Sequence, residues 1–264
     1  MYEGGNVMLD FFILFNLVIL LPILIFGVII SKINKYVSEK LNTNSKWWIY
    51  MICGAIGTPI HELSHLISNL LFGHKIEKVA LFRPIKGKKD GVLGYVHFSY
   101  NANSIYQNIG LFVSGIAPML GGSLVLFLLV KILLPGVFVS LDYFDLDNLY
   151  VFDIFSNIKD SVLNNMQLLF NNYGKIENLI IFLVLSFSIS SHMDISYADL
   201  KSALMGGIVL EIILLVVSIM IGGFKLGFFI EFVFLISSYL ISFFILGLIF
   251  SLISLVIAFV LSLF

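Results

Sequence analysis

Charged side chains are scarce in this sequence. Only 12% of its 264 residues are charged, 59% are hydrophobic, and the mean hydropathy is +1.05. A soluble domain usually carries about 25% charged residues. Several stretches longer than the ~18 residues that mark a membrane helix contain no charge at all. The composition therefore predicts an all-α multi-pass membrane protein, with residues 1–264 forming one membrane-embedded domain.

Three further scarcities exclude other classes. The net charge of -1 lacks the basic excess that a nucleic-acid partner requires. Cys53 is the single cysteine, so neither an intrachain disulfide nor a thiolate metal cage can form. Any metal site must use histidine and carboxylate ligands. No basic residue precedes the first apolar segment, which follows Glu3 and Asp10, so we expect a permanent span there and not a cleaved signal.

The apolar segments predict about six to seven transmembrane helices. The last segment is too long for one ~30 Å hydrocarbon core, so we expect two spans or a kinked pair there. The predicted spans cover residues 11–30, 47–72, 109–134, 176–190, 204–222 and one or two helices within 228–264.

The charges between these spans predict an orientation. Residues 73–106 carry six basic and two acidic side chains, whereas residues 136–175 carry five aspartates and two lysines. The positive-inside rule places the first connection in the cytoplasm and the second outside. Residues 31–46 disagree, because they carry four lysines although strict alternation puts them outside. We expect a protein of the cell membrane whose polar site faces the cytoplasm.

The basic connection also contains a predicted β-hairpin. Residues 75–82 and 94–100 have strand-like sequences, and polar and apolar residues alternate through the second. Between them, residues 86–91 (KGKKDG) end in Asp90-Gly91, a dipeptide typical of hairpin turns. We expect this hairpin to lie on the membrane surface beside the second span.

The second predicted span carries the motif HELSH at residues 61–65. On a helix, positions i and i+4 share a face, so His61 and His65 can bind one metal ion. Glu62 lies beside them as a general base, and zinc lowers the pKa of a bound water to near 7. Ionisable residues inside a span are costly and indicate function. The alternative is a polar cluster that joins helices through hydrogen bonds.

A catalytic zinc ion needs a third protein ligand. Residues 191–200 (SHMDISYADL) follow the fourth predicted span, which would run parallel to the second and end at the same membrane face. Asp199 is the first candidate, Asp194 the second and His192 the third.

The HELSH motif in a hydrophobic helix, followed by a hairpin, a small-residue span and a later aspartate, resembles the site-2 protease clan of intramembrane zinc metalloproteases. The resemblance covers about residues 46–205, the expected catalytic core. It implies that His61, His65 and a distant aspartate bind zinc while Glu62 is the catalytic base. The commonest clan members carry Asp-Gly at the third ligand, a pair that neither candidate aspartate forms. Residues 114–122 (SGIAPMLGG) are similar to a stretch near the clan's site, which implicates Gly115 and Pro118 in substrate binding.

The predicted activity is zinc-dependent hydrolysis of peptide bonds in transmembrane or membrane-associated protein substrates. A transmembrane substrate must unwind first, and its extended segment is expected to add to the hairpin as a further strand, against Val96 and Phe98. Three alternatives stay open: a CAAX-type or other membrane hydrolase acting on peptides outside the bilayer, a metal carrier or transporter, and an inactive scaffold. The carrier has no support from inverted repeats, and the intact HELSH motif argues against the scaffold.

Overall fold

The computed structural model describes residues 12–13, 15–41, 47–134, 151–171, 174–221 and 227–263. These segments are helical apart from one small hairpin, as the composition predicted. The helices are η1 (Asn16–Leu20, a π-helical turn), α2 (Leu21–Leu41), α3 (Trp47–Leu71), α4 (Pro84–Asp90), α5 (Ile105–Leu133), α6 (Val151–Asn171), α7 (Ile176–Ser190), α8 (Tyr197–Ile221) and α9 (Gly227–Ser262). The strands are β1 (Lys75–Ala80) and β2 (Tyr95–Ser99).

Among the described residues, four helices are long and apolar enough to cross a membrane: Asn16–Leu41, Ile105–Leu133, Tyr197–Val217 and Val233–Ser262. The membrane class is supported in this form, but the predicted six to seven spans are not confirmed. Helix α3 is not among the four, because its second half is rich in polar residues. Helix α7 spans only 15 residues.

Several predicted boundaries are wrong. Helix α2 continues to Leu41, so Lys32, Lys35 and Lys40 lie on a helix and not in a loop. Residues 151–171 form helix α6, whereas the sequence predicted a connection over residues 136–175. Three of the five aspartates in that predicted connection fall in residues 135–150, which lie outside the described residues. The tail is one helix, α9, and not two spans. Helix α8 begins seven residues earlier than predicted, at Tyr197.

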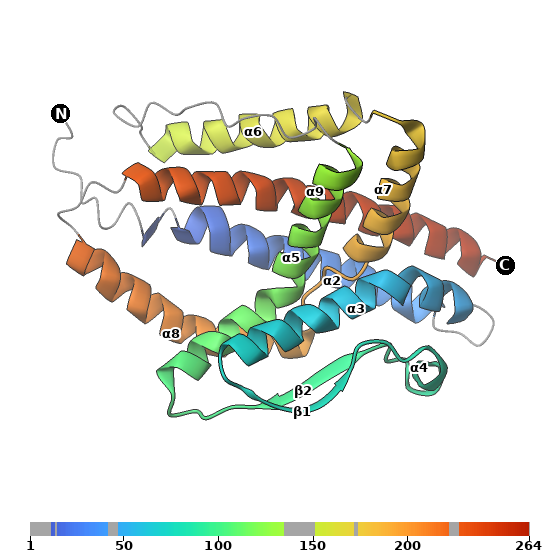
Figure 1. Cartoon of the computed structure of the whole chain (residues 1–264), viewed down its shortest axis with the longest axis horizontal. Coiled ribbons are helices and arrows are strands. Elements are labelled where there is room, and N and C mark those ends of the chain that lie inside the picture. The colour runs from blue at the N-terminus through green and yellow to red at the C-terminus, as the bar shows by residue number, and fades with distance from the viewer. Residues whose placement is uncertain are drawn as a thin grey trace.

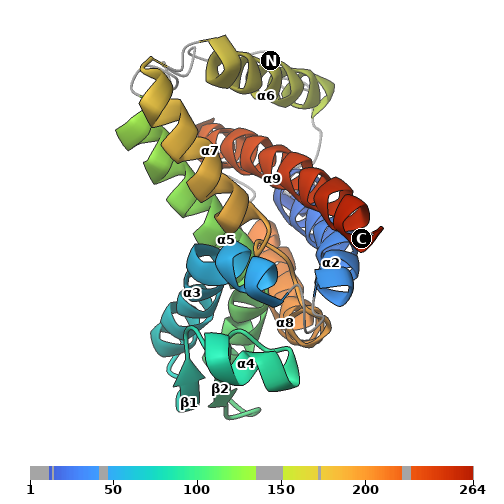
Figure 2. The same cartoon turned by 90° about the vertical axis from the view of Figure 1, so that its right-hand side faces the viewer.

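The helices form two crossed groups (Figures 1 and 2). Helix α2 packs along α9, and α5 packs along α7 on another side. The largest apolar core lies where α5 meets α9, around Met119, Leu126 and Phe244, which are almost fully buried. Helix α8 packs closely on α5, because glycines replace bulky side chains where the two meet. A Cβ at Gly115 would collide with the backbone oxygen of Asp199 and with Ala203.

The predicted hairpin is confirmed as a two-stranded antiparallel sheet that lies against α3. Its connection differs from the prediction, however. The KGKKDG segment forms most of helix α4, which has Pro84 at its start and ends at Gly91 in the left-handed conformation (φ 75°). Asp90-Gly91 is therefore a helix end and not a hairpin turn. Proline at the start and glycine just past the end are the usual signals of a short helix.

Candidate metal centre

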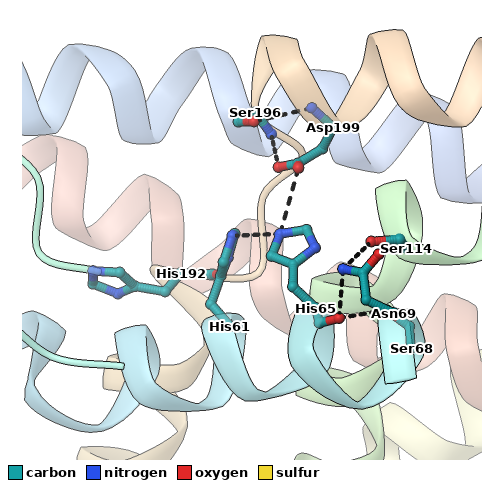
Figure 3. Close-up of polar contacts among 8 residues, drawn as sticks. All are labelled: His61, His65, Ser68, Asn69, Ser114, His192, Ser196 and Asp199. Atoms are coloured by element: carbon teal, nitrogen blue, oxygen red, sulfur yellow. Dashed lines mark hydrogen bonds and ion pairs between the residues drawn. The ribbon is translucent and has the colours of Figure 1, made fainter. Parts of the chain in front are cut away.

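Two histidines of α3 face the same point in space. His61 and His65 are separated by one helical turn, and their rings meet edge to face with centroids 4.9 Å apart. The two Nε2 atoms are 3.2 Å apart. The HELSH spacing thus brings two potential ligand atoms together, as the sequence predicted (Figure 3).

Asp199 reaches the same point from α8. It occupies the first turn of that helix, and its Oδ1 lies 3.4 Å from Nε2 of His65. The Asp199 backbone N–H donates to Oγ of Ser196 at 3.1 Å, and the Ser196 N–H donates to Oδ2 of Asp199 at 3.1 Å. This reciprocal pair is a capping box, which satisfies two free donors at the start of a helix. It leaves Oδ1 directed at the histidines.

The three side chains fit a metal ion of the zinc type. Their potential ligand atoms all lie within 4.8 Å of one another. Atoms bound at ~2.05 Å in tetrahedral geometry are about 3.3 Å apart. Nε2 of His65 lies 3.2 Å from Nε2 of His61 and 3.4 Å from Oδ1 of Asp199, close to that distance. Two imidazoles and one carboxylate are a donor set that, in known catalytic zinc sites, leaves a fourth position open.

Backbone contacts hold the histidines in place. Nδ1 of His61 donates to the carbonyl oxygen of His192 at 2.8 Å, which leaves Nε2 of His61 as the ligand atom directed at the cluster. Below His65, its own carbonyl accepts from Nδ2 of Asn69 at 2.8 Å. The same Asn69 amide donates to Oγ of Ser114 on α5 at 3.0 Å, so α3 is tied to α5 beside the site.

The other two candidates for the third ligand lie beside the cluster but are not part of it. The side chain of His192 points away from the cluster (Figure 3), and its Nδ1 contacts Oγ of Ser191 at 3.0 Å. Burial lowers the pKa of His192 to about 4, so the ring is neutral. The Asp194 carboxylate is near Asn34 of α2 and does not belong to the three-residue cluster. Of the three candidates, the structure brings Asp199 to the two histidines.

Glu62 lies under the hairpin. Its side chain is buried, and both His61 and Asp199 act on it electrostatically. A Cβ placed at Gly94 would lie 2.6 Å from Cγ of Glu62, so glycine is required just before β2. The Glu62 carboxylate therefore lies close enough to His61 and Asp199 for their charges to act on it.

The four residues predicted to bind substrate are packed within the protein to different degrees. Val96 and Phe98 are half-buried in β2. The Phe98 ring stacks on that of His74, with centroids 5.1 Å apart. Gly115 contacts Asp199 as described, and Pro118 is buried inside α5. Gly115 therefore supports the position of a candidate ligand, and substrate binding by these four residues stays a prediction.

Sequence reasoning missed several residues that build the site. Ser196 could have been found, since S-x-x-D at residues 196–199 is a capping-box pattern. The carbonyl of His192 and the amide of Asn69 gave no comparable signal, because their roles depend on tertiary packing.

Comparisons with known proteins add no relative. No protein-family model matches the chain, and neither a curated protein nor a solved structure matches it.

Proposed function

We propose that this protein is a zinc-dependent peptidase that cleaves membrane-associated or transmembrane proteins. The observation that carries the proposal is the convergence of His61, His65 and Asp199, whose ligand atoms lie within 4.8 Å. The two histidines come from one helix and the aspartate from another, 134 positions further along the chain than His65. Such a set does not arise from local sequence alone. The resemblance of the HELSH motif to the site-2 protease clan supports the same proposal.

Each side chain has a role in the proposed reaction. His61, His65 and Asp199 would hold the zinc ion. Zinc in such a site supplies a Lewis acid for the peptide carbonyl and lowers the pKa of a bound water to near 7. Glu62 accepts a proton from the attacking water and later delivers it to the nitrogen of the departing amine, as the C–N bond breaks. The carbonyl of His192 keeps the His61 ring in its binding tautomer.

The hairpin is the proposed entry for substrate. A two-stranded sheet leaves one edge of each strand unpaired, and such edges accept an extended peptide as a further strand. Because Gly94 of the same hairpin touches Glu62, a peptide bound along β2 would run close to the base.

The test uses the purified protein with a transmembrane peptide substrate in detergent. We expect cleavage by the wild type, inhibition by a zinc chelator and recovery when zinc is added back. Glu62→Gln should retain zinc and lose cleavage. Zinc binding without cleavage in the wild type, together with zinc uptake into sealed vesicles, would contradict the peptidase and favour the carrier.

A further inference from the structure

Helices α2 and α9 run side by side in the same direction (Figures 1 and 2). Val18, in the turn before α2, belongs to one apolar cluster with Phe234 of α9. Near the end of α2, Val37 belongs to another cluster with Ala258. Both helices are among the four that are long and apolar enough to cross a membrane, so the outer surface of the pair would face lipid.

The last parts of the two helices differ in polarity. A Cβ placed at Gly247 of α9 would lie 3.5 Å from Cδ1 of Ile30 of α2, so these two residues lie at the same height along the pair. From there to its end, α2 carries three lysines and one glutamate. Residues 248–262 of α9, about 22 Å of helix, carry no charged side chain. A basic surface and an apolar surface therefore lie next to each other.

An open groove of about 570 Å³ separates these two surfaces. Its α9 wall is apolar, and Val256 and Phe259 in that wall are 62% and 54% exposed. Its α2 wall carries an ammonium and a phenol hydroxyl beside one apolar side chain. The lining residues are Lys32, Ile33, Tyr36, Leu255, Val256 and Phe259.

A second lysine extends the basic wall. Lys32, Tyr36 and Lys40 follow one another at intervals of four residues, so they are neighbours along the surface of α2. Nζ of Lys40 lies 5.4 Å from the centre of the Tyr36 ring, over a residue that lines the groove. Within the described part of the chain, neither lysine forms an ion pair. Glu39, the one acidic residue of α2, lies four residues after Lys35, where opposite charges on a helix attract.

We propose that this groove binds one anionic phospholipid. Its phosphate contacts Lys32 and Lys40, and an acyl chain covers the α9 wall. A soluble anion would neutralise the lysines but leave Val256 and Phe259 exposed, and a neutral lipid would cover the wall but bring no counter-charge. Basic pockets between membrane helices bind anionic headgroups in this way. The proposal does not depend on peptidase chemistry.

The first experiment measures which lipid reaches the α9 wall. A fluorophore is attached to Val260→Cys, one turn beyond Val256, in a Cys53→Ser background. The protein is placed in nanodiscs of phosphatidylcholine that contain a minor share of phospholipid with brominated, quenching acyl chains. We expect brominated phosphatidylglycerol to quench more strongly than the same share of brominated phosphatidylcholine.

A matched position separates a site from general enrichment of the anionic lipid. Leu124→Cys places the fluorophore on an exposed position of α5, another candidate span. There the two brominated lipids should quench equally. Equal quenching by the two lipids at Val260→Cys, or the same preference for phosphatidylglycerol at both positions, would overturn the proposal.

The second experiment removes the charges of the basic wall. Lys32→Gln and Lys40→Gln are made singly and together in the Val260→Cys protein. A lysine near an anionic surface strengthens the attraction about fivefold, so we expect the double variant to lose most of its preference for phosphatidylglycerol. Lys159→Gln combined with Lys175→Gln removes two exposed lysines elsewhere and should leave the preference intact. An unchanged preference in the double variant of α2 would contradict headgroup binding by these lysines.

Discussion

Ser196 and Asp199 exchange two hydrogen bonds at the first turn of α8, each 3.1 Å long. The exchange fixes where α8 begins and which oxygen of Asp199 faces His65. Ser196 lies outside the set of potential ligands and orients Asp199, which belongs to it. The same holds for His192, whose backbone and not its ring contacts His61.

Removing the cap should weaken zinc binding without removing a ligand. Ser196→Ala loses the hydroxyl that accepts from Asp199, and loss of such an outer-shell contact lowers metal affinity by about 10–100-fold. The dissociation constant is measured by competition with a chromophoric chelator. Ser262→Ala, which alters a hydroxyl bonded only within α9, is the control. Equal zinc affinity in all three proteins would refute a positioning role for Ser196.

Glycine at position 115 should be required because it lets α8, and with it Asp199, pack closely against α5. Gly115→Ala places a methyl group against the Asp199 carbonyl and Ala203, so α8 must move away from α5. Overpacking of this kind costs about 1–3 kcal/mol. We expect a lower melting temperature and weaker zinc binding. Gly207→Ala is a matched control, since its Cβ would meet the Phe112 ring at an ordinary 3.4 Å. The prediction fails if both variants behave like the wild type.

Glu62→Gln separates binding from chemistry. The amide keeps the shape of the buried side chain but cannot accept a proton, and general-base catalysis contributes about 10²–10⁴-fold in rate. Zinc content should therefore stay at the wild-type level while peptide cleavage falls by that factor. Cleavage at the wild-type rate would remove Glu62 from the proposed mechanism.

A proline in β2 tests the strand-addition hypothesis. Val96→Pro removes a backbone donor from the sheet, so an added peptide strand would lose its register. We expect cleavage to drop while zinc content is unchanged, and Val96→Ala to stay close to wild type. Unimpaired cleavage by the proline variant would exclude pairing along this strand.

The parts of the structure that follow from local sequence were the ones predicted correctly. The i, i+4 spacing of His61 and His65 determines their shared face, and alternation through residues 95–100 indicated β2. Helix α4 and the start of α8 were missed although Pro84, Gly91 and the S-x-x-D pattern marked them. Each of these signals spans only a few residues, whereas the long apolar runs dominate the hydropathy pattern on which the predicted boundaries were based.

Other features could not have been predicted from one sequence. The contact between Gly94 and Glu62 and the tie from Asn69 to Ser114 depend on how distant helices pack. The predicted count of six to seven spans is not confirmed: four helices among the described residues are long and apolar enough to cross a membrane.

The most direct test of the proposed ligand set is the zinc content of purified variants, measured by elemental analysis without chelators. We predict about one zinc per wild-type chain, as one open site requires. The metal should be lost in His61→Ala and Asp199→Ala and kept in Asp194→Ala and His192→Ala, since neither of those side chains belongs to the cluster. Zinc retained in Asp199→Ala but lost in Asp194→Ala, or no zinc in the wild type, would contradict the metal centre proposed for this protein.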